Sequence, residues 1–347
     1  MSTGNSILIK NIYYMLAYAY KALYREGFEK TGTEKFEHIH NLFAAILARG
    51  IEYQLKQGLA KDYLKHNRTQ KVLRSKVDIN GTLKLLSRKE RSLNCVYDVL
   101  TEDILLNRIL KSAAILLLHN GDVTQENKNN LKRVLLFFGN VREVNPFNIN
   151  WSLLSYRKGN ASYQMLVYLC RLLFDGLLIN KNGRIELAEF LDSQHLCDLY
   201  EKFVLAYYQR HYPHFNPSAP FVAWNLDDGQ DAFLPKMYTD ITLESSDKVL
   251  IIDTKCYRRI LSQQYDKKSV CSANLYQIYA YVKNKSAATD KTVSGMLLYA
   301  KTDEDITPDV AYSMGGNKIF VRTLDLNCEF EKIKEQLDKI VAENFTV

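Results

Sequence analysis

The chain has 347 residues, enough for two domains with hydrophobic cores of their own. Its 47% hydrophobic and 24% charged residues are ordinary for a soluble globular protein and exclude a largely disordered chain. Lys and Arg outnumber Asp and Glu by 46 to 39, and the net charge of +7 gives weak support to a polyanionic partner such as nucleic acid.

Cysteine usage and hydropathy indicate the compartment. The six cysteines include no Cys-x-x-Cys pair, which predicts free thiols in a reducing environment and argues against a disulfide framework or a zinc site. The pairs His211-x-x-His214 and His38-x-His40 lack cysteine partners and are interpreted as surface or packing residues. No apolar stretch approaches the roughly 18 residues of a membrane helix, and the N-terminus lacks a signal-peptide pattern. We expect a cytoplasmic protein with no membrane partner.

The N-terminal half is predicted to be mostly helical. Residues 9–24 keep a helical spacing of apolar residues, with Asn11 as a capping residue. The tyrosines of this segment favour a buried helix over an exposed interaction face. Further helices are predicted over residues 36–57, 102–119 and 162–173, and from Thr124 to about residue 138.

A basic segment interrupts these helices. Residues 61–91 hold ten Lys or Arg against three acidic residues. The pieces Lys71–Ile79 and Thr82–Leu86, joined at Asn80-Gly81, predict a β-hairpin. Contact with DNA phosphates, contact with a protein partner, and a solvent-exposed edge protected by lysines remain open as interpretations.

The C-terminal half predicts an α/β fold. Asn180-Lys-Asn-Gly183 is typical of a turn, and we place the boundary between a mostly helical domain, 1–182, and a second domain, 183–347, beside it. The second domain is expected to be a mixed central sheet flanked by helices. The predicted helices are 195–210, 272–283 and 329–343, and the predicted strands are 237–243, 248–254, 295–300 and 318–324.

The two strands from Pro235 to Lys255 carry the most informative residues. Because side chains alternate along a strand, Asp253 and Lys255 project to the same side, and the hairpin brings Asp240 beside Asp253. Paired carboxylates are suitable ligands for Mg²⁺, and a neighbouring lysine stabilises charge on a phosphate or orients a water. An Asp-x-Lys on a solvated surface is the common alternative, but Asp253 ends an apolar run, 249–252, where a strand leaves a core.

Three further residues complete a pattern. Gln277 and Tyr281 are four residues apart on one helix face, and Glu201 lies on the helix that precedes the hairpin. Together with Pro235-x4-Asp240 and Asp253-x-Lys255, they resemble the PD-(D/E)xK nuclease superfamily, in the branch with a Gln-x3-Tyr motif. The C-terminal domain is therefore expected to have a PD-(D/E)xK restriction-endonuclease-like core.

Nearly the whole chain resembles a narrower family. The segments that carry this resemblance are Ile9–Ala19, Glu102–Lys111, Thr239–Thr242, Leu250–Lys255 and Asn274–Tyr279. They are similar to the McrC family, the nuclease subunits of McrBC modification-dependent restriction systems. The resemblance implies an endodeoxyribonuclease that cuts double-stranded methylated DNA with a McrB-type AAA+ GTPase hexamer, engaged and stimulated by the N-terminal region.

The resemblance also implies roles for the site residues. Asp240 and Asp253 match the metal carboxylates, helped by the Thr254 carbonyl and Glu201, with Mg²⁺ as the cofactor. Catalytic roles are implied for Asp240, Asp253, Lys255, Gln277 and Tyr281 in metal-assisted phosphodiester hydrolysis. Candidates for DNA contact are Arg258, Arg259, Lys267 and Lys268.

The sequence agrees with a system in which the partner, and not this chain, binds the nucleotide. No Gly-x4-Gly-Lys-Ser/Thr motif is present, so we expect no GTP or ATP site in this chain. Two alternatives remain: a non-catalytic activator or plug of an AAA+ ring, and a nuclease of a related system without methylation dependence.

Overall fold

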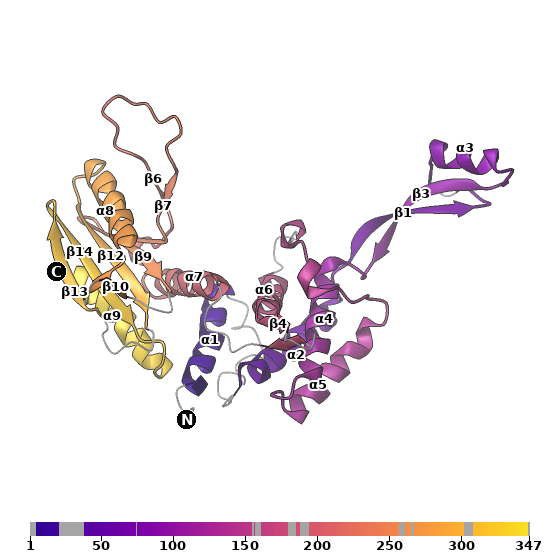
Figure 1. The fold of residues 1–347 in the computed structure, drawn as a ribbon, viewed down its shortest axis with the longest axis horizontal. Helices are drawn as coiled ribbons and strands as arrows, with labels where there is room; N and C mark the ends of the chain where they lie inside the picture. Colours follow the sequence, from indigo (N-terminus) through magenta and orange to yellow (C-terminus); the bar gives the residue numbers. More distant parts are fainter. Residues whose placement is uncertain are drawn as a thin grey trace. The chain divides into compact units, whose positions relative to one another are not determined.

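The computed structural model describes residues 5–20, 38–73, 75–154, 156, 161–179, 185–187, 194–256, 261–264, 267–301 and 308–345. They form two compact units, one of Phe43–Phe174 and one of Met1–Leu42 with Asp175–Val347 (Figure 1). The second break, after Phe174, lies close to the expected boundary at residue 182. The first 42 residues differ from the expectation, because they group with the C-terminal part of the chain.

Helix α1 (Asn5–Tyr20) explains that grouping. Asn11, expected as a cap, is instead buried, and its Nδ2 donates to the carbonyls of Leu326 and Cys328 at 2.6 and 2.8 Å. Tyr14 stacks on Phe330 with ring centroids 4.2 Å apart. The described side chains of the helix are mostly buried, which confirms the core interpretation of its tyrosines. The N-terminal helix is thus part of the α/β core.

The remaining elements of this unit follow residue 174. The helices are α7 (Gln194–His211), the 3-10 turn η5 (Pro213–Phe215), α8 (Ser272–Ala287) and α9 (Phe330–Phe345). The strands are β4 (Leu177–Ile179), β5 (Ile185–Leu187), β6 (Phe221–Val222), β7 (Met237–Tyr238), β8 (Ile241–Glu244), β9 (Lys248–Lys255), β10 (Leu261–Gln264), β11 (Lys267–Val270), β12 (Thr292–Ala300), β13 (Val310–Met314) and β14 (Asn317–Leu324). The predicted mixed α/β architecture is confirmed, and the predicted helices and strands are in place except for the strand 237–243, which is divided between β7 and β8.

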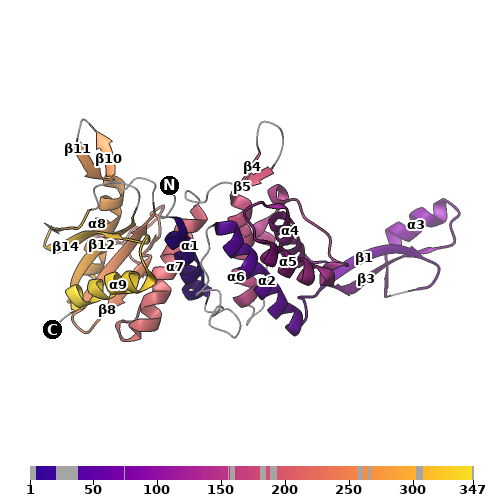
Figure 2. The same cartoon turned by 90° about the horizontal axis from the view of Figure 1, so that it is seen from below.

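The central sheet has the order β13-β14-β12-β9-β8. Strands β14, β12 and β9 are parallel, and β13 and β8 are antiparallel at the two edges. Helix α8 covers one face by packing on Val249, Ile251 and Leu297, while α7 and α9 lie on the other (Figures 1 and 2). At Gly295 a Cβ atom would lie 2.7 Å from Val282, so only glycine permits this close approach of α8 to β12.

The second unit is mostly helical, as expected. Its helices are α2 (Ile39–Gln57), α3 (Ile79–Ser87), α4 (Leu105–His119), α5 (Gln125–Leu135) and α6 (Ala161–Asp175), with 3-10 turns η2 (Leu136–Phe138), η3 (Pro146–Asn148) and η4 (Trp151–Leu153). Its strands are β1 (Asp62–Gln70), β2 (Lys76–Val77) and β3 (Leu93–Thr101), in the order β1-β3-β2. No helix among the described residues is long and apolar enough to cross a membrane.

The expected hairpin of Lys71–Ile79 with Thr82–Leu86 is wrong. Helix α3 occupies the expected turn and second strand, and Asp78 is the physical reason. Its carboxylate accepts from the Gly81 N–H at 3.1 Å and caps the helix, so Asn80 and Gly81 lie in the first helical turn. The cap thus places Asn80-Gly81 in a helix where a hairpin turn was expected.

Strands β1 and β3 form a long antiparallel ribbon that was not predicted. They pair from Asp62 opposite Thr101 to Gln70 opposite Leu93, and α3 lies at the far end of the ribbon from α4 and α5 (Figure 1). We call β1, β2, α3 and β3 the arm.

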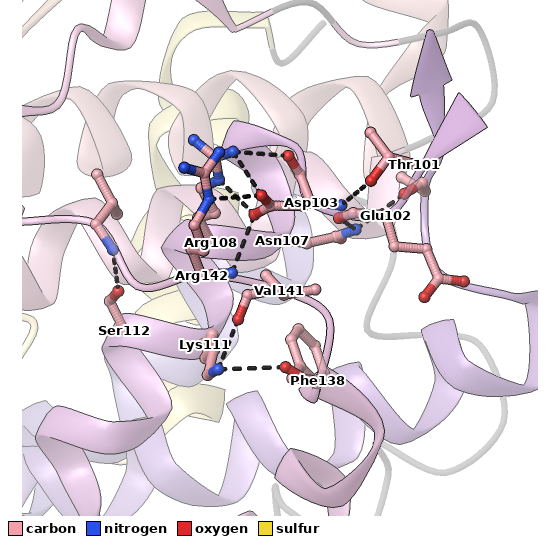
Figure 3. A network of polar contacts seen from close by, with 12 residues as sticks. Thr101, Glu102, Asp103, Asn107, Arg108, Lys111, Ser112, Phe138, Val141 and Arg142 are labelled. Carbon is pink, nitrogen blue, oxygen red and sulfur yellow. Dashed lines mark hydrogen bonds and ion pairs between the residues drawn. The ribbon is translucent and has the colours of Figure 1, made fainter. Parts of the chain in front are cut away.

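A polar network holds the base of the arm (Figure 3). Buried Asn107 on α4 donates to the carbonyls of Ala60 and Glu102, which lie just before β1 and just after β3 at the same end of the ribbon. Its Oδ1 accepts from the Tyr163 hydroxyl, which in turn accepts from Ala60 N–H. The base of both strands is therefore fixed to α4 and α6.

Asp103 forms the second part of this network. Arg108 donates from two nitrogens to its two carboxylate oxygens, at 2.6 and 2.8 Å, and Arg142 donates from its backbone and its Nε. These hydrogen bonds from Arg108 hold the pKa of Asp103 well below its usual range. The carboxylate thus stays ionised and keeps the turn between β3 and α4 in one conformation.

Candidate nuclease site

The site lies where β8 begins and β9 ends. The pairing of Ile241 with Ile252 places Asp240 next to Asp253, as the sequence predicted. The expected strand 237–243 is split, since β7 pairs with β6 and Asp240 lies in the break between β7 and β8. The Thr239 and Thr242 hydroxyls lie 3.0 Å apart on either side of it.

Asp253 is the most buried ionisable residue of this site. Its side chain is fully buried, and Oδ1 accepts no hydrogen bond from any described residue. Lys255 Nζ lies 2.6 Å from Oδ2. The pKa of Asp253 is raised to about 6, mainly by burial. The Lys255 charge lowers this pKa and the Asp240 charge raises it.

Gln277 and Tyr281 join the same site from α8. Lys255 Nζ donates to Gln277 Oε1 at 3.1 Å, and Gln277 Nε2 donates to the Tyr281 hydroxyl at 2.9 Å. Burial raises the pKa of Tyr281, so its hydroxyl stays protonated. The structure therefore brings together Asp253, Lys255, Gln277 and Tyr281 in one chain of polar contacts.

Glu201 on α7 shares the electrostatics of the site. Burial, together with the charges of Asp240, Asp198 and Asp253, raises the pKa of Glu201 to about 7. Within the described parts of the chain, no group of three or more His, Cys, Asp or Glu side chains is gathered as a metal cluster. Glu201 is thus near the two aspartates without completing a three-carboxylate set.

The oxygen ligands available at this site fit Mg²⁺. A buried carboxylate oxygen without a hydrogen-bond donor is costly unless a cation or water reaches it, and Asp253 Oδ1 is such an atom. Mg²⁺ is bound in proteins by one or two carboxylates, with water and substrate phosphate completing its octahedron. Asp240 and Asp253 would hold the ion, with the Thr254 carbonyl and Glu201 beside them.

Sequence reasoning missed Asn274 and Tyr299. Both are buried, and Asn274 Nδ2 donates to the Tyr299 hydroxyl at 2.9 Å. Tyr299 is opposite Lys255 in the pairing of β12 with β9. Helical spacing could have indicated Asn274, because it precedes Gln277 by one turn of α8. The strand register that brings Tyr299 beside Lys255 is not visible in the sequence.

The four basic residues proposed for DNA contact remain predictions. Lys267 and Lys268 lie on β11, which pairs with β10 in a two-stranded hairpin. Arg258 and Arg259 lie outside the described residues.

The raised pKa of Glu201 makes the metal-free protein sensitive to pH. A carboxyl with a folded pKa near 7 stabilises the fold below its unfolded pKa, and this contribution is lost as pH rises through 7. In EDTA at pH 8, Glu201→Gln is expected to raise stability by about 1–3 kcal/mol after allowance for partial exposure, with little change at pH 5. Thermal melting across pH measures this; Glu335→Gln, an exposed site on α9, is the control. Parallel melting curves for Glu201→Gln and wild type would contradict it.

A mixed sheet flanked by helices, with Asp240, Asp253 and Lys255 where β8 and β9 meet, defines the C-terminal unit as a PD-(D/E)xK restriction-endonuclease-like fold. The chain belongs to the family of McrBC 5-methylcytosine restriction system components, whose model matches residues 4–300. This match confirms the resemblance seen in the sequence.

The chain is also similar to a curated relative and to solved structures. The chain is 24% identical over 344 residues to the Type IV methyl-directed restriction enzyme EcoKMcrBC of Escherichia coli (strain K12), covering 97% of this chain and 98% of the relative. A refined half-complex from a tetradecameric assembly of Thermococcus gammatolerans McrB AAA+ hexamers with bound McrC aligns at TM-score 0.50 and 16% identity, over 96% of this chain and 75% of that one. The cryo-EM structure of the Thermococcus gammatolerans McrBC complex aligns over 57% of this chain and 56% of that one, at 18% identity and TM-score 0.40.

Proposed function

We propose that this chain is the Mg²⁺-dependent DNA endonuclease subunit of a modification-dependent restriction complex, cutting methylated DNA when assembled with a McrB-type AAA+ GTPase hexamer. The observation that carries the proposal is Asp253, a buried carboxylate beside Asp240 and Lys255 with one oxygen, Oδ1, that accepts no hydrogen bond within the described part of the chain. Membership in the McrBC family supplies the restriction context.

The site residues divide the work of phosphodiester hydrolysis. A bound Mg²⁺ would supply positive charge at the phosphate and acidify a water molecule. Asp240 and Asp253 hold the ion, and Lys255 orients the attacking water or stabilises charge on the scissile phosphate. Gln277 accepts from Lys255, and Tyr281 lies next to Gln277, so the ammonium keeps its position before substrate arrives.

The arm is the proposed contact to the GTPase. Three apolar side chains of α3 (Ile79, Leu83 and Leu86) follow each other at helical spacing and are 70%, 57% and 55% exposed. An exposed apolar stripe of this kind on a soluble protein marks an interaction surface. The network around Asn107 and Asp103 fixes the base of the arm, so a force or a conformational change at α3 would be passed on to the helical unit.

The same arm favours a second candidate function, in which this chain activates or plugs an AAA+ ring and its own nuclease activity is not essential. One experiment separates the two. The purified chain, its GTPase partner, GTP and Mg²⁺ are incubated with plasmid that does or does not contain 5-methylcytosine. We expect cleavage of the methylated plasmid and not of the unmethylated one, and none without Mg²⁺. GTPase stimulation without cleavage would support the activator, and equal cleavage of both plasmids would indicate a system without methylation dependence.

A further inference from the structure

Thr254 contacts Asp240 through its N–H and its hydroxyl, which are not the group, the carbonyl, proposed above to lie beside the metal. Its backbone N–H and its side-chain hydroxyl both donate to one oxygen of Asp240, Oδ2, at 2.7 and 2.8 Å. Thr254 itself is only 9% exposed. Because side chains alternate along β9, this hydroxyl lies on the face opposite Asp253 and Lys255.

We infer that the Thr254 side chain is a positioning residue that fixes the carboxylate of Asp240 so that its other oxygen, Oδ1, is directed to the cation. The inference deepens the proposed function and rests on it. A single donor leaves a carboxylate free to rotate about its terminal torsion, whereas two donors on one oxygen fix it. The Thr254 side chain is suited to this role because a β-branched residue has a restricted χ1 in a strand.

The backbone of Asp240 is fixed separately. Thr239 N–H donates to the Pro220 carbonyl at 3.2 Å, and the buried hydroxyls of Thr239 and Thr242 contact each other. These contacts hold the chain at the break between β7 and β8, and they do not touch the Asp240 carboxylate. The Thr254 hydroxyl is therefore the side-chain group whose removal changes the orientation of that carboxylate and leaves its backbone in place.

The test compares Thr254→Val with Thr254→Ser. Valine has nearly the same shape as threonine but no hydroxyl, and serine restores the hydroxyl. Loss of a group that orients a metal ligand typically weakens metal binding by about 10–100-fold. We expect Thr254→Val to weaken Mg²⁺ binding to the full chain, measured by calorimetry, by about tenfold or more, and Thr254→Ser to stay within about threefold of wild type. In the reconstituted complex, the Mg²⁺ concentration for half-maximal cleavage should rise in parallel for the valine variant.

A matched control removes a different strand hydroxyl. Thr323 on β14 donates to the Pro308 carbonyl at 3.0 Å, and Thr323→Val should leave Mg²⁺ binding unchanged. Asp253→Ala is included as a test of the metal site itself. If Asp253→Ala loses Mg²⁺ binding while Thr254→Val keeps it, or if the valine and serine variants are weakened equally, the positioning role is wrong and the proposed function stands. If wild type binds no Mg²⁺, the proposed metal site and this inference are both overturned.

Discussion

Asp253→Ala is expected to abolish DNA cleavage by the reconstituted complex, lowering the rate by about 10³-fold or more. The substitution removes a proposed metal ligand, the buried carboxylate whose Oδ1 accepts no hydrogen bond from the residues that the structure describes. The fold should tolerate the change, because burial already raises the pKa of Asp253 and disfavours its charge in the metal-free protein. Cleavage of methylated plasmid under single-turnover conditions measures the effect.

Stimulation of the partner's GTPase serves as the control for the same variant. The arm and the nuclease site belong to different compact units, so the variant should still raise GTP turnover to the wild-type level. Lys255→Ala is expected to lose cleavage as well, but it leaves Asp253 buried without its cation, a loss of about 3–5 kcal/mol in stability for a buried pair. Asp253→Ala is therefore the cleaner variant. Wild-type cleavage by either variant would refute the site assignment.

The arrangement of Asp240, Asp253 and Lys255 was predictable because strand periodicity fixes it. Alternation along β9 places Asp253 and Lys255 on one side, and the short turn before Lys248 sets the register that brings Asp240 beside them. Helical spacing likewise placed Gln277 and Tyr281 on one face of α8. These are local relations, which a single sequence contains.

Relations between distant segments were not predictable. The position of α1 in the C-terminal unit depends on Asn11 bonding to carbonyls more than 300 residues away. Strands β1 and β3 pair although the whole of α3 lies between them in the sequence. The strongest local signal in that segment, Asn80-Gly81, indicated a hairpin turn where the structure has a helix. The role of the Thr254 hydroxyl was also hidden, because it depends on which oxygen of Asp240 it meets.

Replacing the apolar stripe of α3 is expected to separate the two functions of the chain. In the triple variant Ile79→Gln, Leu83→Gln and Leu86→Gln, each side chain loses about 1.5–2 kcal/mol of burial at an interface, so association with the GTPase should weaken by about 100-fold or more. Glutamine is a good helix former and the three positions are largely exposed, so α3 should persist. Stimulated GTP hydrolysis, titrated against the concentration of this chain, measures the loss.

The control keeps the helix and changes its polar positions. Asn80→Gln with Ser87→Gln alters exposed residues of α3 and should stimulate the GTPase as wild type does. The triple variant should keep its Mg²⁺ affinity, because its substitutions lie in the other compact unit. If the basic residues of the arm contact DNA instead, Lys84→Glu would reduce DNA binding in a salt-dependent way and the glutamine variant would stimulate normally. Normal stimulation by the glutamine variant would overturn the assignment of the α3 stripe to the GTPase. The salt dependence identifies a contact with DNA phosphates, because loss of an apolar contact should be nearly independent of salt.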